Sequence, residues 1–110
     1  MLMDSTEPRI TLHPHERRVL VKIDGTLLAD TTQAIELRER SYPPRQYQPR
    51  EDVRMDLLAR SETVTHCPLK GDAYYYSFGK NKDVAWSYEQ PLEGMEAIAG
   101  RLGFYEEFME

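Results

Sequence analysis

Residues 18–29 read RVLVKIDGTLLA, and this stretch decides the fold class. Its apolar residues Val19, Val21 and Ile23 fall on one face of a two-residue period, which is typical of a half-buried strand. An Asp-Gly pair, residues 24–25, follows at once and precedes a second apolar run. Such a pair is the strongest local signal for a β-hairpin, because a tight primed turn needs positive φ at both central residues. The sequence therefore predicts two antiparallel strands here.

Further strand-like runs, separated by turn signals, continue along the chain. Alternation along DAYYYSF predicts a strand with Ala73, Tyr75 and Ser77 on one face and the intervening aromatic residues on the other. The predicted segments are a hairpin arm at 34–37 ending near the prolines at 43–44, a loop or edge strand at 61–65, strands at 72–78 and 84–88 joined by a turn at 79–82, and a final edge strand at 102–105.

Helical signals are weak. Pro49 predicts one helical turn that carries Glu51 and Asp52 near its positive end. Near the C-terminus, the spacing of Met95 and Ile98 suggests a helix whose length the neighbouring glycines limit. We therefore expect a mostly β protein, a small single-domain antiparallel β-sandwich or partly open barrel with one or two short helices.

Length and composition narrow the class of protein. The chain has 110 residues, so we expect 1–110 to form one domain with 1–16 as a loosely attached N-terminal arm. With 14 basic and 19 acidic side chains, the net charge of −5 argues against a nucleic-acid partner. No run reaches the roughly 18 apolar residues of a membrane span, and the N-terminus lacks the features of a signal peptide. We expect a soluble, cytoplasmic protein.

The first candidate cluster of polar residues spans residues 45–52, with arginines near both ends. The sequence predicts a rim of hydrogen-bond donors formed by Arg45, Tyr47 and Arg50. Such a rim suits a carboxylate or phosphate, because a guanidinium binds either group with two hydrogen bonds. In the alternative interpretation, Arg50 pairs with a carboxylate nearby in the sequence and fixes a loop, since structural ion pairs are commoner than binding sites.

The second cluster, residues 65–71, holds the only cysteine of the chain. Cys67 beside His66 and Lys70 is a candidate nucleophile, because nearby positive charge stabilises a thiolate. Neighbours on a strand point to opposite faces, however, so His66 is badly placed to activate Cys67 unless the chain turns there. The alternative is that Cys67 is a small buried apolar residue. Lys70 and Gly71 fit a binding role, since a lysine supplies charge and a glycine lets a ligand approach the backbone.

The third cluster is aromatic, and part of it must form the core of the sheet. Its members are Tyr74, Tyr75, Tyr76, Phe78, Trp86, Tyr88, Phe104 and Tyr105. Trp86 and Tyr88 share one face two residues apart, and such a flat pair with polar handles suits a planar ligand. For Trp86 the alternative is a purely structural place in the core. The histidines at 13, 15 and 66 have poor metal-ligand spacing, so we expect no metal and no cofactor.

Four strings of residues occur in order along the chain: YQPREDV at 47–53, THCPLKGDAYY at 65–75, AWSY at 85–88 with Pro91, and IAG at 98–100 with FY at 104–105. Together they resemble domain-of-unknown-function family 427, which is also catalogued as nucleotidyltransferase-like. The resemblance covers roughly residues 19–105, and the ordered set is more specific than any single string.

The resemblance implies a compact, mostly antiparallel fold of the β-tent type, without the paired cysteines of its zinc-anchored relatives. It implies no established reaction. Nucleotidyl transfer needs carboxylates that hold Mg²⁺ and a phosphate-binding loop, and neither stands out, so that activity is an alternative. The motif positions of the family fall on Tyr47, Arg50, Asp52, His66, Cys67, Lys70, Gly71, Tyr74, Trp86 and Tyr88.

The leading hypothesis is a module that binds a small anionic or planar ligand in a pocket lined by Arg, Lys and aromatic side chains. It predicts that Arg50 and Lys70 converge on one cleft. One alternative is an enzyme with Cys67 as nucleophile and His66 or Lys70 as its partner. Another is a non-catalytic protein-interaction module that forms a symmetric homodimer through a surface aromatic patch.

Overall fold

The computed structural model describes residues 9–109, and its strands follow the turn signals of the sequence. Strands β2 (Val19–Ile23) and β3 (Thr26–Thr31) form a separate two-stranded antiparallel sheet. Between them, Asp24 and Gly25 have φ angles of 51° and 81°. These are the positive values that a tight hairpin turn requires, so the predicted hairpin is confirmed.

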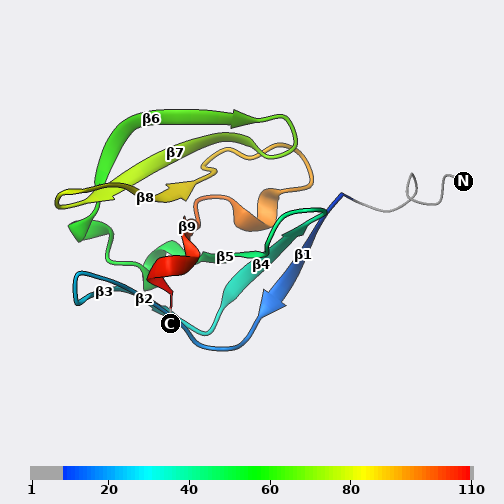
Figure 1. The fold of residues 1–110 in the computed structure, drawn as a ribbon. Helices are drawn as coiled ribbons and strands as arrows, with labels where there is room; N and C mark the ends of the chain where they lie inside the picture. Colours follow the sequence, from blue (N-terminus) through cyan, green and yellow to red (C-terminus); the bar gives the residue numbers. More distant parts are fainter. Residues whose placement is uncertain (1–8, 110) are drawn as a thin grey trace, which may run out of the picture.

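The other strands form one seven-stranded sheet in the order β1-β4-β5-β9-β8-β7-β6, and every neighbouring pair is antiparallel (Figure 1). The edges β1 and β6 do not pair with each other, so the sheet is open rather than a closed barrel. The predicted fold class, mostly β and antiparallel, is confirmed. The strands are β1 (Ile10–His15), β4 (Ala34–Glu39), β5 (Arg45–Gln48), β6 (Ala59–Cys67), β7 (Gly71–Phe78), β8 (Asn81–Ser87) and β9 (Leu102–Phe104).

Two segments differ from expectation in where they lie. The predicted edge strand at 102–105 is β9, which pairs with β5 on one side and β8 on the other and therefore lies inside the sheet. Part of the segment expected to be a loose arm is β1, which pairs with β4 along all six of its residues. Residues 1–8 of that segment lie outside the described residues.

The helical segments are single 3-10 turns. The turn predicted after Pro49 is present as η2 (Arg50–Asp52). Instead of a longer helix near Met95, the chain forms only η4 (Glu96–Ile98). The φ angles of Gly94 and Gly100 are 94° and 73°, which are values that end a right-handed helix on both sides. The remaining turns of this kind are η3 (Met55–Leu57) and η5 (Glu106–Phe108).

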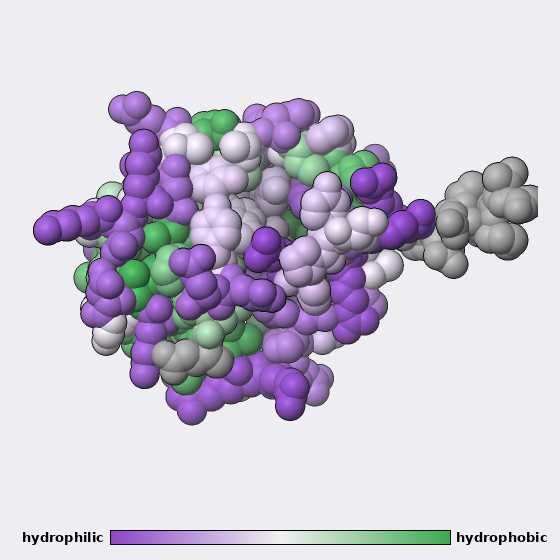
Figure 2. Space-filling model, in the orientation of Figure 1, coloured by the Kyte–Doolittle hydropathy of each residue, from purple (hydrophilic) through white to green (hydrophobic). Residues whose placement is uncertain are grey.

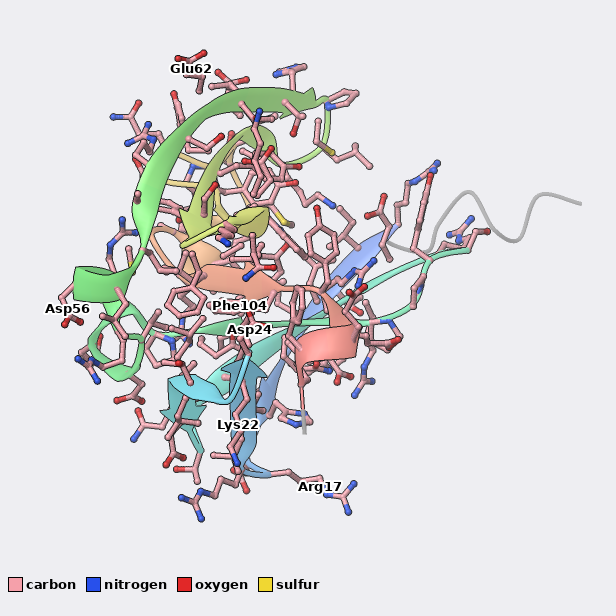
Figure 3. All side chains as sticks on the ribbon, turned by 60° about the vertical axis from the view of Figure 1, so that its left-hand side comes forward. Arg17, Lys22, Asp24, Asp56, Glu62 and Phe104 are labelled. Atoms are coloured by element: carbon pink, nitrogen blue, oxygen red, sulfur yellow. The ribbon has the colours of Figure 1, made fainter. Side chains whose placement is uncertain are left out.

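One hydrophobic core lies between the β2–β3 hairpin and the seven-stranded sheet. Val21 and Leu28 of the hairpin are fully buried in it, together with Phe104 of β9. Figure 3 shows Phe104 inside the molecule, whereas Lys22 of the hairpin points outward. Tyr76 joins this core from β7, while Ala73 and Tyr75 of the same strand join a second one. The two-faced pattern predicted for β7 is therefore confirmed.

The second core occupies the other face of the sheet, which is strongly curved. Lys70 Nζ, in the β6–β7 turn, lies 3.0 Å from Glu39 Oε1 at the end of β4. In a flat sheet these strands would be four or five strand spacings apart, roughly 20 Å. The sheet therefore bends until its two wings meet, as Figure 1 shows for β6–β7 above and β4–β1 below. The second core and the candidate site lie in this bend.

Candidate functional site

A pocket of about 310 Å³ opens in the concave face of the sheet, between its two wings. Figure 2 shows pale side chains of intermediate hydropathy gathered in the middle of one face, bordered by both hydrophobic and hydrophilic ones. The pocket receives residues from β4, β5, β6, β7 and β8 and from the segments that join them. Its lining consists of Leu37, Glu39, Tyr42, Pro43, Arg45, Tyr47, Cys67, Lys70, Tyr75, Trp86, Tyr88 and Tyr105.

Packed aromatic rings form the floor. The indole Nε1–H of Trp86 donates to the Tyr47 hydroxyl at 3.0 Å, and the two rings meet edge to face with their centroids 6.2 Å apart. Tyr105 tilts against Trp86 at 4.8 Å between centroids. Gly103 makes this packing possible, because a Cβ there would lie 2.8 Å from Trp86 Cε2. The indole thus lies directly against the backbone of β9.

Burial raises the pKa of the tyrosines on the floor. It raises the pKa of Tyr47 to about 12, because the phenolate would lose its hydration there. Burial also raises the pKa of Tyr88, and the neighbouring Tyr47, Cys67, Tyr75 and Glu39 add to the shift. Both hydroxyls therefore stay protonated to a more alkaline pH than an exposed tyrosine and can donate hydrogen bonds.

Three charged side chains stand around this floor, and two of them neutralise each other. Lys70 and Glu39 form a nearly buried ion pair, with only 13% and 12% of their side chains exposed. Lys70 Nζ also lies 5.7 Å from the centre of the Tyr88 ring. Arg45 is half-buried and holds its guanidinium 5.8 Å from the centre of the Trp86 ring. No carboxylate in residues 9–109 lies within ion-pair distance of Arg45. One open cation thus faces the aromatic floor.

The structure brings together part of the residue set predicted from the sequence. The predicted residues that line the pocket are Arg45, Tyr47, Cys67, Lys70, Trp86 and Tyr88. His66, Gly71 and Tyr74 instead line a smaller hollow of about 140 Å³. Arg50 lines neither of these, and Asp52 lies beside it in η2.

The prediction that Arg50 and Lys70 converge on one cleft differs from the structure at Arg50. Its guanidinium donates to the Gly100 carbonyl at 2.7 Å, to the Tyr76 hydroxyl at 2.8 Å and to Glu89 at 3.3 Å. Tyr76 belongs to the core on the opposite face of the sheet from the pocket. Arg50 therefore joins segments of the fold, as the alternative interpretation expected, although its carboxylate partner is Glu89 rather than a residue nearby in the sequence. Lys70 alone of the pair reaches the cleft.

Cys67 and His66 lie on opposite sides of β6. Cys67 is half-buried and lines the pocket, whereas the imidazole of His66 is exposed, with its Nδ1 2.7 Å from Asp72 Oδ1. The strand continues straight to Cys67, so the turn that could have joined the two side chains is absent at that point. His66 is not positioned to take a proton from the thiol.

Several residues that complete the pocket are not among those predicted from the sequence. Tyr75 and Tyr105 belong to the aromatic cluster of the sequence, and that membership was the signal that could have found them. Tyr75 lies opposite Trp86 on the neighbouring strand β7, whereas Tyr105 follows β9 and packs against Trp86. Glu39 gave no local signal, because its partner Lys70 lies 31 residues away. Leu37 lies on β4, and Tyr42 and Pro43 lie in the connection between β4 and β5.

The arrangement offers hydrogen-bond donors beside closely packed aromatic rings. Within residues 9–109, no three His, Cys, Asp or Glu side chains are grouped so that they could hold a metal ion. In the same range, no helix has the length and apolar character needed to cross a membrane.

Comparison with known proteins identifies the family. No curated protein matches the chain. A family model described as a domain of unknown function (DUF427) matches residues 11–110, and the family also carries a nucleotidyltransferase label. This match covers the hairpin, both cores and every residue of the pocket, so the chain belongs to the DUF427 family.

Proposed function

We propose that this domain binds a small planar organic anion in the concave pocket. The observation that carries the proposal is Arg45, a half-buried guanidinium over the Trp86 ring with no carboxylate partner in the described part of the chain. A guanidinium held in place above a pocket can bind a carboxylate with two parallel hydrogen bonds. The part of the indole that faces the pocket provides an apolar surface against which the rest of the ligand can pack.

The size and composition of the pocket support the same class of ligand. A volume of about 310 Å³ is at the lower end of the range for small-molecule sites, so the ligand is small. Tyr47, Tyr88 and Trp86 are almost fully buried and fixed by packing, so that little side-chain ordering is needed on binding. Because Glu39 already neutralises Lys70, the pocket favours a ligand with a single negative charge.

Isothermal titration calorimetry with benzoate and naphthalene-2-carboxylate tests this proposal. We expect the wild-type protein to bind the larger, better stacking anion more tightly. Arg45→Gln should weaken both by about 10- to 100-fold, which corresponds to the loss of a charged hydrogen-bonded pair. Arg54→Gln is the matched control, because Arg54 is exposed and pairs with Asp56 outside the pocket. Its binding should equal that of the wild type.

Two results would overturn the proposal. One is that neither anion binds; the other is that Arg45→Gln binds them as tightly as the wild type does. Rapid alkylation of Cys67 in the folded protein by iodoacetamide, with no binding of either anion, would favour the alternative of a nucleophilic enzyme.

A further inference from the structure

The hydroxyl of Tyr88 is a donor in the pocket wall without a protein acceptor in residues 9–109. The residue is only 7% exposed and lines the pocket, yet its hydroxyl makes no hydrogen bond within residues 9–109. The other buried tyrosine of the floor is satisfied, because Tyr47 accepts from Trp86. Tyr75, which is half-buried, bonds to Thr65. The unpaired polar atoms that are fully enclosed among the described residues belong to Gln48, Asp83 and Ser87, so the Tyr88 hydroxyl is accessible from the pocket. It can bond to water or to an acceptor atom of a ligand that displaces that water.

The surroundings of this hydroxyl determine which kind of acceptor it can meet. Burial and the nearby Glu39 carboxylate keep the phenol protonated, so it acts as a donor. The same carboxylate would repel a second negative charge on a ligand, and Lys70 is already engaged by it at 3.0 Å. A neutral acceptor, such as a carbonyl oxygen or a ring nitrogen, fits this position.

The hydroxyl and the open guanidinium belong to different parts of the floor. Arg45 lies over Trp86, whereas Tyr88 is reached through Tyr47, whose ring contacts Trp86 at 6.2 Å and Tyr88 at 6.3 Å between centroids. A flat molecule with its carboxylate at Arg45 therefore needs its second polar atom at a distance from the carboxylate to reach Tyr88.

We infer that the ligand is a planar carboxylic acid with a neutral hydrogen-bond acceptor remote from its carboxylate, and that Tyr88 determines specificity for that acceptor. The inference rests on the proposed function and specifies the ligand class for the same pocket. Arg45 binds the carboxylate of the ligand, and the aromatic rings of the pocket pack against its flat ring system. The Tyr88 hydroxyl distinguishes acids that carry the acceptor from acids of the same shape that lack it.

Two isosteric acids test the inference. Quinoline-6-carboxylate differs from naphthalene-2-carboxylate by one ring nitrogen in place of a C–H, in the ring that does not carry the carboxylate. Calorimetry on the wild-type protein should show quinoline-6-carboxylate binding about three- to tenfold more tightly, the value of one net hydrogen bond. In Tyr88→Phe the ratio should fall to about one, because the donor is lost while the ring remains. Tyr74→Phe, a phenol outside the pocket, should keep the wild-type ratio.

The outcomes separate this inference from the proposed function. If both acids bind the wild type equally and both need Arg45, the inference is wrong and the proposed function stands. If the preference persists in Tyr88→Phe, another group reads the acceptor and the inference is again wrong. If neither acid binds, both proposals are overturned. Because the Tyr88 hydroxyl makes no hydrogen bond to residues 9–109, Tyr88→Phe should unfold at the wild-type temperature. The ratio of the wild-type affinities for the two acids also tests the inference without any variant.

Discussion

The indole N–H of Trp86 depends on a single acceptor, the hydroxyl of Tyr47, and both side chains are buried. Tyr47→Phe keeps the ring but leaves that N–H unpaired, which should cost about 1–3 kcal/mol of unfolding free energy. Urea unfolding measures the change. Tyr42→Phe is the control, because Tyr42 is 61% exposed and should show no loss. Equal stability of Tyr47→Phe and the wild type would show that this bond does not hold the floor of the pocket.

The same tyrosine makes stability depend on alkaline pH. Its pKa is raised to about 12 in the folded protein, whereas an unfolded tyrosine titrates near 10. The folded state thus holds its proton more tightly, so its stabilising contribution is complete below pH 10 and is lost as pH rises towards 12. Between pH 9 and pH 11, the wild type should lose about 1 kcal/mol more than Tyr47→Phe. Urea midpoints at the two pH values measure this difference, and parallel losses in the two proteins would contradict it.

For a single residue, the sequence predicts what its side chain can bind better than it predicts where that side chain points. Arg45 and Arg50 stand in one polar string and have the same capacity to bind an anion. Their separation depends on partners far along the chain, because Arg50 meets Glu89, 39 residues away, and Arg45 meets Trp86. The opposite placement of His66 and Cys67 could be predicted, since it follows from strand geometry alone.

Among the elements, η2 is joined to the rest of the fold by Arg50. Its guanidinium connects this short turn to the Gly100 carbonyl and to Tyr76 of β7. Arg50→Gln should lower the unfolding free energy by about 1–2 kcal/mol and leave binding of naphthalene-2-carboxylate unchanged. Arg54→Gln, next to η2 but exposed, should change neither quantity.

Urea unfolding and calorimetry on the same samples distinguish the two roles considered for Arg50. Weaker binding of naphthalene-2-carboxylate by a fully folded Arg50→Gln variant would show that Arg50 contributes to the ligand site. It would contradict the structural role described above.

Strand identity was predictable where the signal is local, and strand order was not. The Asp-Gly turn and the alternation in β7 are encoded by adjacent residues, so both were predicted. The three residues of β9 look like an edge strand because they are short and close to the C-terminus. Their central place depends on pairing with β5, for example Tyr47 with Gly103, which no pattern near residue 103 reveals.

Across the whole molecule, the Lys70–Glu39 pair joins the two wings of the curved sheet above the pocket. Glu39→Gln leaves the nearly buried ammonium without its carboxylate and should cost about 1–3 kcal/mol of unfolding free energy. The matched control is Asp30→Asn, which breaks the exposed pair with Arg18 and should cost less than about 1 kcal/mol. Urea unfolding compares the two, and equal costs would show that burial of the Lys70 pair contributes nothing.

The most direct test of the ligand site is a crystal structure of the protein grown with naphthalene-2-carboxylate. The carboxylate is predicted to lie within hydrogen-bond distance of the Arg45 guanidinium, with the rings stacked in the concave pocket against Trp86. A carboxylate bound instead at the cationic surface of Arg60, Lys80 and Lys82, or an acid that leaves the Arg45 guanidinium without contact, would contradict the assignment.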